Sequence, residues 1–187
     1  MLTTLAGLTL ELVPHCASVP RTGWTGSHDP RPLSADGHRQ ARDLVAALGT
    51  GIAAVYSSPA LRCRQTVEPL ATAAGLAVTD MAEWAEADDF REPEAWTKGV
   101  FAGIAGAVGG AWSAGRGLRA ALAIGARHPG ARVVASSHGD VIPVLVATLC
   151  AVYGAPVPVV PDRGGWYTLG FGDGSLTITT HGEVYSG

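Results

Sequence analysis

Apolar runs alternate along the chain with amphipathic stretches, and this alternation predicts strands and helices in turn. The run 8–13, with the sequence LTLELV, first alternates between apolar and polar residues and is then apolar, as expected for a strand that enters a core. Near the C-terminus, two such runs flank a Gly-Asp-Gly turn, which is typical of a hairpin. The predicted strands are 8–13, 52–58, 76–80, 131–140 and the two arms of the hairpin, 164–171 and 175–182.

Four other segments have apolar residues at helical spacing. The predicted helices are 32–50, 60–75, 116–130 and 141–154. Ser34 is the expected N-cap of the first helix, and Gly49 is expected to end it. Pro69 lies inside the second helix and should kink or break it, whereas Pro143 falls in the first turn of the fourth, where proline is tolerated.

The order of these elements predicts an α/β fold. Strands that alternate with helices imply a mainly parallel sheet with helices on both faces, so we expect a three-layer α/β/α sandwich. The 187 residues suit a single domain, 1–187. Within it, the stretch 81–112 is acidic and then glycine-rich with weak helical patterning. We therefore expect a lid or insertion at about 87–115 rather than core.

Composition and charge exclude two classes of partner. A net charge of -3 and an isoelectric point near 6.0 give no overall attraction to nucleic acid or to an anionic membrane. The three cysteines have no CxxC spacing, which argues against a disulfide framework and a structural zinc site. The N-terminus has no basic segment typical of a signal peptide, and no apolar run is long enough to span a bilayer. These features favour a cytoplasmic protein.

Three of the expected strands end in polar residues: His15 follows the first, Ser57 and Arg62 follow the second, and His138 follows the third. Ligands of parallel sheets bind at the carboxyl ends of the strands, so we expect these side chains to converge. No trio of acidic residues accompanies the histidines, which disfavours a metal site. Histidine with arginine instead fits an anionic ligand, above all phosphate.

The order and spacing of four motifs resemble the histidine phosphatase superfamily, also called phosphoglycerate mutase-like. That family shows an Arg-His-Gly turn after its first strand, where this chain has Pro14, His15 and Cys16. The other similar segments are RPLSADGHRQA at 31–41, SSPALRCRQT at 57–66, SHG at 137–139 and, more loosely, GGWYTL at 164–169. The resemblance spans about residues 8–170, with 80–115 poorly matched, and it implies a phosphoglycerate mutase-like sandwich.

The resemblance also implies roles for individual residues. The family's first histidine attacks phosphorus and becomes phosphorylated, and His15 matches it. Arg62 and His138 match the family's second arginine and second histidine. A carboxyl group usually protonates the leaving oxygen, and Glu86 is the best match for it, with Glu83 as the alternative. The resemblance implies no metal and no organic cofactor.

Two residues depart from the family pattern. Pro14 stands in place of the arginine before the nucleophile, and the loss of one preorganised donor to a transition state costs about 3–4 kcal/mol. Cys16 stands in place of glycine, and its Cβ is expected to make the pocket tighter. Arg21 or Arg31 is a candidate to replace part of the lost charge. The expected substrate-binding residues are Arg21, Arg31, Ser57 and Gly139.

Two functional hypotheses remain at this point. In the first, the chain is a phosphohydrolase that acts on a small phosphomonoester or on phosphohistidine. In the second, it is a degenerate family member that binds an anionic ligand or uses the pocket for other acid–base chemistry. A nucleic-acid module is disfavoured because the sequence has no basic stripe. The joint presence of His15, Arg62 and His138 favours the enzyme.

Overall fold

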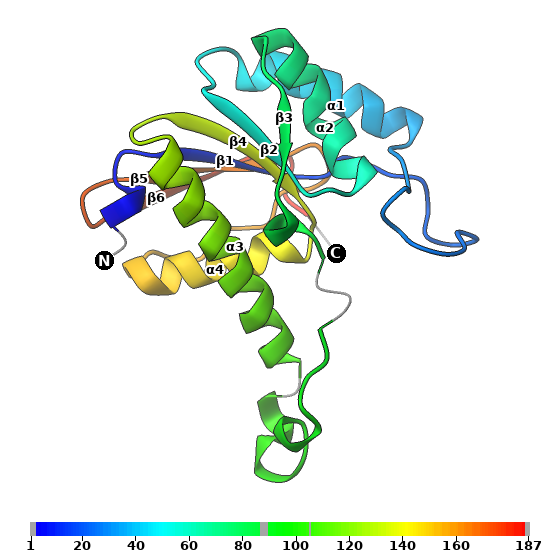
Figure 1. Ribbon diagram of the computed structural model, residues 1–187, viewed down its shortest axis with the longest axis vertical. Coiled ribbons are helices and arrows are strands. Elements are labelled where there is room, and N and C mark those ends of the chain that lie inside the picture. The colour runs from blue at the N-terminus through cyan, green and yellow to red at the C-terminus, as the bar shows by residue number, and fades with distance from the viewer. Residues whose placement is uncertain (1–2, 87–89, 105, 186–187) are drawn as a thin grey trace.

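The computed structural model describes residues 3–86, 90–104 and 106–185, which form one mixed sheet of six strands between two layers of helices (Figure 1). The strands are β1 (Thr9–Pro14), β2 (Ala54–Ser57), β3 (Val78–Asp80), β4 (Arg132–Ser137), β5 (Trp166–Phe171) and β6 (Leu176–His181). Their order is β3-β2-β4-β1-β5-β6. The first four are parallel neighbours, and β5 and β6 form an antiparallel hairpin beside β1. The expected mainly parallel sheet and closing hairpin are confirmed.

Helices cover both faces of the sheet, as the three-layer prediction requires. The helices are α1 (Ala35–Leu48), α2 (Leu61–Ala74), α3 (Ala107–Arg127) and α4 (Val141–Tyr153). Figure 1 shows α1 and α2 on one face and α3 and α4 on the other. Ser34 caps α1 as expected, because its side chain accepts from the Gly37 N–H, and Gly49 ends that helix. The remaining helical turns are η1 (Thr3–Leu5), η2 (Ala82–Trp84), η3 (Glu94–Trp96) and η4 (Gly99–Ile104).

The apolar strands supply a separate core on each face of the sheet. Successive side chains of a strand point to opposite faces. In β1, Leu12 belongs to the cluster under α3 and α4, and Val13 belongs to the cluster under α1 and α2. Ala135 and Val134 of β4 divide in the same way. Both faces of these central strands are therefore buried, which explains why their sequences become continuously apolar.

The start of α3 differs from the prediction. Sequence patterning placed this helix at 116–130, but it runs from Ala107 to Arg127. The carboxylate of Glu92 accepts from the N–H groups of Gly106 and Gly109, at 3.1 and 2.9 Å, and thus caps the first turn. These hydrogen bonds hold the pKa of Glu92 below its usual value. Glycines before residue 116 weaken the helical pattern of the sequence. The Glu92 carboxylate, which lies outside the helix, stabilises the first turn by accepting from its free N–H groups.

Two further expectations need correction. A break at Pro69 was an open alternative, but α2 continues through this residue as one helix. Val67 and Leu70 on either side are buried in the core, and their packing offsets the backbone hydrogen bond that proline removes. Residues 81–112 were expected to lie outside the core, but Trp84 is fully buried under α3 and α4.

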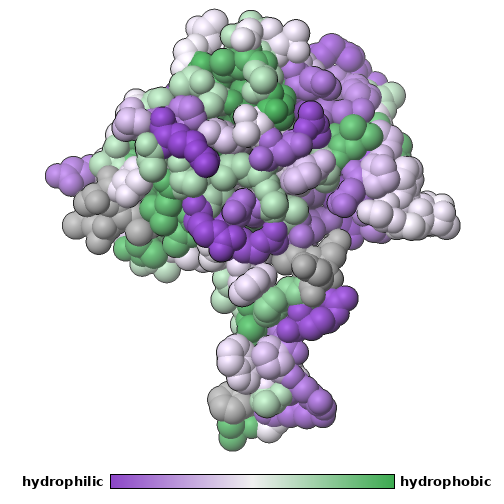
Figure 2. Space-filling model, viewed as in Figure 1, coloured by the Kyte–Doolittle hydropathy of each residue, from purple (hydrophilic) through white to green (hydrophobic). Residues whose placement is uncertain are grey.

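The expected lid at about 87–115 is partly described. Residues 87–89 and 105 lie outside the described ranges. Of the rest, η3, η4 and the first turns of α3 project from the sandwich (Figure 1), and the surface of this projection includes hydrophobic residues (Figure 2). Val100 is one of the exposed apolar side chains in this segment. Whether this projection works as a lid stays a prediction. In the described part of the chain, no helix combines the length and apolar character needed to cross a bilayer.

Candidate active site

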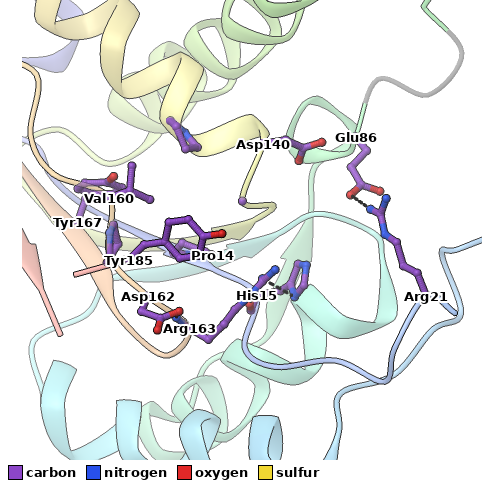
Figure 3. A pocket seen from close by; sticks show the side chains of 13 residues that line it. Pro14, His15, Arg21, Glu86, Asp140, Val160, Asp162, Arg163, Tyr167 and Tyr185 are labelled. Atoms are coloured by element: carbon purple, nitrogen blue, oxygen red, sulfur yellow. Dashed lines mark hydrogen bonds and ion pairs between the residues drawn. The ribbon is translucent and has the colours of Figure 1, made fainter. Parts of the chain in front are cut away.

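A cavity of about 470 Å³ opens at the carboxyl ends of the parallel strands. Its wall has a polar part, formed by His15, Arg21, Glu86, Gly139, Asp140, Asp162 and Arg163, and an apolar part with Pro14, Pro143, Val160, Pro161, Tyr167 and Tyr185. Figure 3 shows Pro14, Val160 and Tyr185 on one side, Glu86 with Arg21 on the other, and Arg163 extending toward His15. None of the described residues between 90 and 115 lines this cavity.

His15 is a buried, neutral imidazole at the end of β1. Its backbone N–H donates to the Ser137 carbonyl at 2.8 Å, which extends the pairing of β1 with β4. Its Nδ1 lies 2.8 Å from the Cys16 carbonyl, and because a carbonyl only accepts, Nδ1 carries the proton and Nε2 keeps its lone pair. Burial lowers the pKa of His15 from 6.5 to about 3, and the charges of Arg163, Arg62 and Arg31 act in the same direction. The imidazole is therefore neutral at neutral pH, with its proton on Nδ1 and none on Nε2.

The loop that follows His15 is anchored by α1 and α2. The Cys16 N–H donates to Oγ1 of Thr66 at 2.9 Å, and the Ala17 N–H donates to Oε1 of Gln40 at 2.9 Å. Gly37 in the first turn of α1 lies so close that an added Cβ would be 1.9 Å from the Ala17 carbonyl oxygen. These contacts fix the backbone on which the imidazole is held.

Cys16 does not narrow the cavity, contrary to expectation. Its side chain is fully buried in the cluster under α1 and α2, beside Val13 and Ala41, and it is absent from the cavity wall. Burial raises the pKa of its thiol to about 11, so it is not a thiolate at neutral pH. The substitution of glycine by cysteine thus extends the core rather than the site.

Arg62 and His138 lie directly behind the cavity wall and contact each other. Arg62 is fully buried on α2, and its Nη2 lies 3.1 Å from Nδ1 of His138. Since arginine can only donate, His138 accepts at Nδ1 and donates from Nε2 to Oγ of Ser58, 2.9 Å away. Burial, with the charge of Arg62, lowers the pKa of His138 to about 2. The rings of His15 and His138 are nearly perpendicular, with centroids 5.6 Å apart.

Glu86 joins this group through two arginines. Its Oε2 accepts from Nη2 of Arg62 at 2.8 Å, and its Oε1 accepts from Nη2 of Arg21 at 2.9 Å. Its Oε1 also lies 3.4 Å from Nδ1 of His138, which is neutral and therefore forms no ion pair with it. The alternative acid, Glu83, instead lies 3.5 Å from Nη2 of Arg119 and does not line the cavity. The geometry thus brings together His15, Arg62, His138 and Glu86, and it favours Glu86 over Glu83.

The expected substrate-binding residues differ in position. Arg21 and Gly139 line the cavity. Arg31 is buried instead, and its Nη1 donates to Oγ of Ser18 and to the Val19 carbonyl, both at 2.6 Å. Ser57 is also buried, and its hydroxyl donates to the Ser58 carbonyl at 2.7 Å. Direct contact of these four residues with a substrate stays a prediction.

Sequence reasoning missed Arg163, which lies beside His15. Its Nη1 donates to the His15 carbonyl at 3.1 Å and lies 3.5 Å from Nδ1 of the same residue. The sequence feature that could have pointed to Arg163 is its position directly before the GGWYTL segment. Cavity residues Asp162 and Tyr185 were missed for the same reason, because they lie in irregular segments without periodicity. In the described part of the chain, no cluster of three or more His, Cys, Asp or Glu residues is arranged to hold a metal.

Comparison with known proteins agrees with this geometry. Residues 12–98 match the histidine phosphatase superfamily (branch 1), whereas the chain matches no curated protein sequence. Among solved structures, YhfR of Bacillus stearothermophilus superposes with a TM-score of 0.72 at 19% identity, over 95% of this chain and 98% of that chain. A phosphoserine phosphatase mutant of Entamoeba histolytica in complex with phosphoserine gives a TM-score of 0.68 at 16% identity, over 92% and 95%.

A third neighbour is the mycobacterial glucosyl-3-phosphoglycerate phosphatase in complex with VO3, with a TM-score of 0.64 at 19% identity, over 95% of this chain and 99% of that chain. At such identities, these neighbours establish the shared phosphoglycerate mutase-like fold. The matched segment 12–98 is thus similar to branch 1 of the histidine phosphatase superfamily, and the fold is shared with these neighbours over nearly the whole length of the chain.

Proposed function

We propose that the protein is a phosphohydrolase that acts on a small phosphomonoester or on phosphohistidine, with His15 as the nucleophile. The observation that carries this proposal is the state of His15 at the cavity wall. The Cys16 carbonyl holds the proton of Nδ1, and burial keeps the pKa of the ring at about 3, so Nε2 has a free lone pair. An imidazole in this state can attack phosphorus.

The reaction has two steps. In the first, Nε2 of His15 forms a bond to phosphorus, the bond from phosphorus to the leaving oxygen breaks, and Glu86 in its protonated form gives that oxygen a proton. In the second, water attacks the phosphohistidine, its proton passes to the Glu86 carboxylate, and phosphate leaves. Arg62 stabilises the charge on the phosphoryl oxygens, and His138 holds the Arg62 guanidinium in place.

Substrate binding requires an exchange of partners at Glu86. Its carboxylate accepts from both Arg62 and Arg21, so it occupies donors that a phosphoryl group also needs. Phosphoryl oxygens take over these donors when the substrate enters, and Glu86 is then free to meet the leaving oxygen. This exchange couples binding of the anion to release of the acid.

The size of the cavity and the neighbouring proteins support a small substrate. A cavity of about 470 Å³ lies within the usual range of small-molecule sites. The structural neighbours are named as phosphatases of phosphoserine and of glucosyl-3-phosphoglycerate, and one is the protein histidine phosphatase SixA in complex with tungstate. Both substrate types carry the phosphoryl group that the proposed site would bind.

A second candidate function is anion binding without turnover. Pro14 favours it, because proline offers no donor beside the nucleophile. This candidate predicts saturable binding of phosphate in the absence of hydrolysis.

Hydrolysis of an aryl phosphate by wild type and His15→Ala distinguishes the two candidates. The phosphatase proposal requires turnover by wild type, its loss in His15→Ala, and an acid-labile, base-stable phosphoprotein after rapid quenching. His38→Ala, at an exposed histidine on α1, is the matched control and should keep wild-type turnover. Vanadate binding by wild type without any turnover would establish the second candidate instead.

A further inference from the structure

Arg163 brings uncommitted donors to the nucleophile from a distant part of the chain. Its Nη1 donates to the His15 carbonyl at 3.1 Å across 148 positions of sequence. Its Nε and Nη2 have no hydrogen-bond partner among the described residues, and the side chain lines the cavity. These N–H groups are thus available to a ligand at the cavity wall.

The other arginines near His15 already donate from their terminal nitrogens, although Nε of Arg31 and Nε of Arg62 are buried without a partner among the described residues. Arg62 donates to the His28 carbonyl at 2.7 Å and to Glu86. Arg31 is buried and holds the loop after β1. Arg21 is exposed, as is Arg163, but its guanidinium is paired with Glu86. Arg163 differs from these three because its guanidinium lines the cavity and forms no ion pair with any carboxylate of the described residues.

The backbone of Arg163 is fixed relative to the nucleophile. The side chain of Gln40 connects the two loops, because its Nε2 donates to the Arg163 carbonyl at 3.1 Å and its Oε1 accepts from Ala17 at 2.9 Å. The Arg163 N–H donates to Oδ1 of Asp162 at 2.7 Å, and Gly164 turns the chain with a φ of 89°. These contacts fix the backbone that carries the guanidinium, and the hydrogen bond from Nη1 to the His15 carbonyl orients the end of the side chain.

We propose that Arg163 is a catalytic residue, which donates from Nε and Nη2 to the oxygens of the phosphoryl group that His15 accepts. The inference rests on the proposed phosphatase function. It also accounts for Pro14: the guanidinium expected beside the nucleophile comes from the loop before β5 instead of from β1. Pro14 then belongs to the apolar part of the wall, with Pro143 and Val160.

Steady-state hydrolysis of an aryl phosphate and titration with vanadate test this role in the full chain. Arg163→Ala should lower kcat/KM about 10²-fold, the effect of one preorganised donor, and should weaken vanadate binding at least about tenfold. Arg163→Lys should retain part of the wild-type kcat/KM and part of the vanadate affinity. Millimolar guanidinium ion should raise the turnover of Arg163→Ala. A purely structural role would not produce this rescue. Arg42→Ala, which removes an exposed arginine of α1 outside the cavity wall, is the matched control and should resemble wild type.

The outcomes separate this inference from the proposed function. Wild-type turnover that Arg163→Ala leaves unchanged would overturn the role of Arg163 and leave the phosphatase function intact. Absence of turnover together with vanadate binding that Arg163→Ala abolishes would overturn the phosphatase function and support Arg163 as an anion-binding residue. A wild-type protein that neither hydrolyses the ester nor binds vanadate would overturn both.

Discussion

The neutral state of His15 and His138 can be measured through the stability of the fold. Burial lowers the pKa of His15 to about 3 and that of His138 to about 2, whereas both take the ordinary value of 6.5 in the unfolded chain. Between about pH 3 and pH 6.5, the unfolded chain therefore binds more protons at these two histidines than the folded chain does. Stability is therefore greatest above pH 6.5 and falls as the pH drops through 6.5 toward 3.

The loss of stability at pH 5 depends mainly on the pKa of histidine in the unfolded chain. Protonation of a histidine with a pKa of 6.5 stabilises the unfolded chain by about 2 kcal/mol at pH 5, and the folded imidazole gains almost nothing there. The two histidines together should lower the free energy of unfolding by about 4 kcal/mol between pH 8 and pH 5. Their solvent exposure of 4% and 1% leaves little screening to reduce this figure.

Urea denaturation of wild type, His15→Asn and His138→Asn at a series of pH values tests this prediction. Carboxylates and the other histidines titrate in all three proteins, so the informative quantity is the difference in unfolding free energy between wild type and variant. That difference should change by about 2 kcal/mol for each variant between pH 8 and pH 5, with the variant losing less stability. His38→Asn, at an exposed histidine of α1, is the control variant in the same series.

A difference that stays constant with pH would refute the reasoning for that histidine. It would mean that the imidazole is protonated in the folded state near pH 6, as in the unfolded chain. A protonated His15 has no lone pair on Nε2, so this result would also remove the main support for a nucleophilic role.

Two other predictions concern the cavity. If Arg163 already supplies a guanidinium, Pro14→Arg should raise the kcat/KM of wild type on an aryl phosphate by less than about tenfold. In the Arg163→Ala background, the same substitution should recover most of the lost kcat/KM. Equal gains in both backgrounds would contradict the idea that the two guanidinium groups replace each other. Glu86→Gln should tighten vanadate binding, because it removes a charge that competes for Arg62 and Arg21. It should also slow hydrolysis of an alkyl phosphate about 10²-fold or more, with a smaller effect on p-nitrophenyl phosphate, whose leaving group needs less help from an acid. Equal loss on both esters would exclude Glu86 as the acid.

Local patterns were sufficient for the elements that dominate the sheet. The apolar run of β1, the hairpin of β5 and β6, and the cap of α1 at Ser34 were predicted near their observed positions. Each depends on side-chain periodicity or on a turn of a few residues, which are properties of neighbouring positions. The first half of α3 was not predictable in this way, because its glycine-rich start depends on Glu92 and on close packing of Gly117 against Leu145 of α4.

The same division applies to the site. The sequence by itself determined that His15, Arg62 and His138 follow three strands, and parallel strands bring their carboxyl ends to one edge, so their convergence followed from topology. Only the tertiary structure decided that Cys16 faces the core, that Glu86 lies between two arginines, and that Arg163 reaches the nucleophile. These contacts join loops that are far apart in sequence, and a loop backbone follows the packing around it rather than any repeat in its own residues.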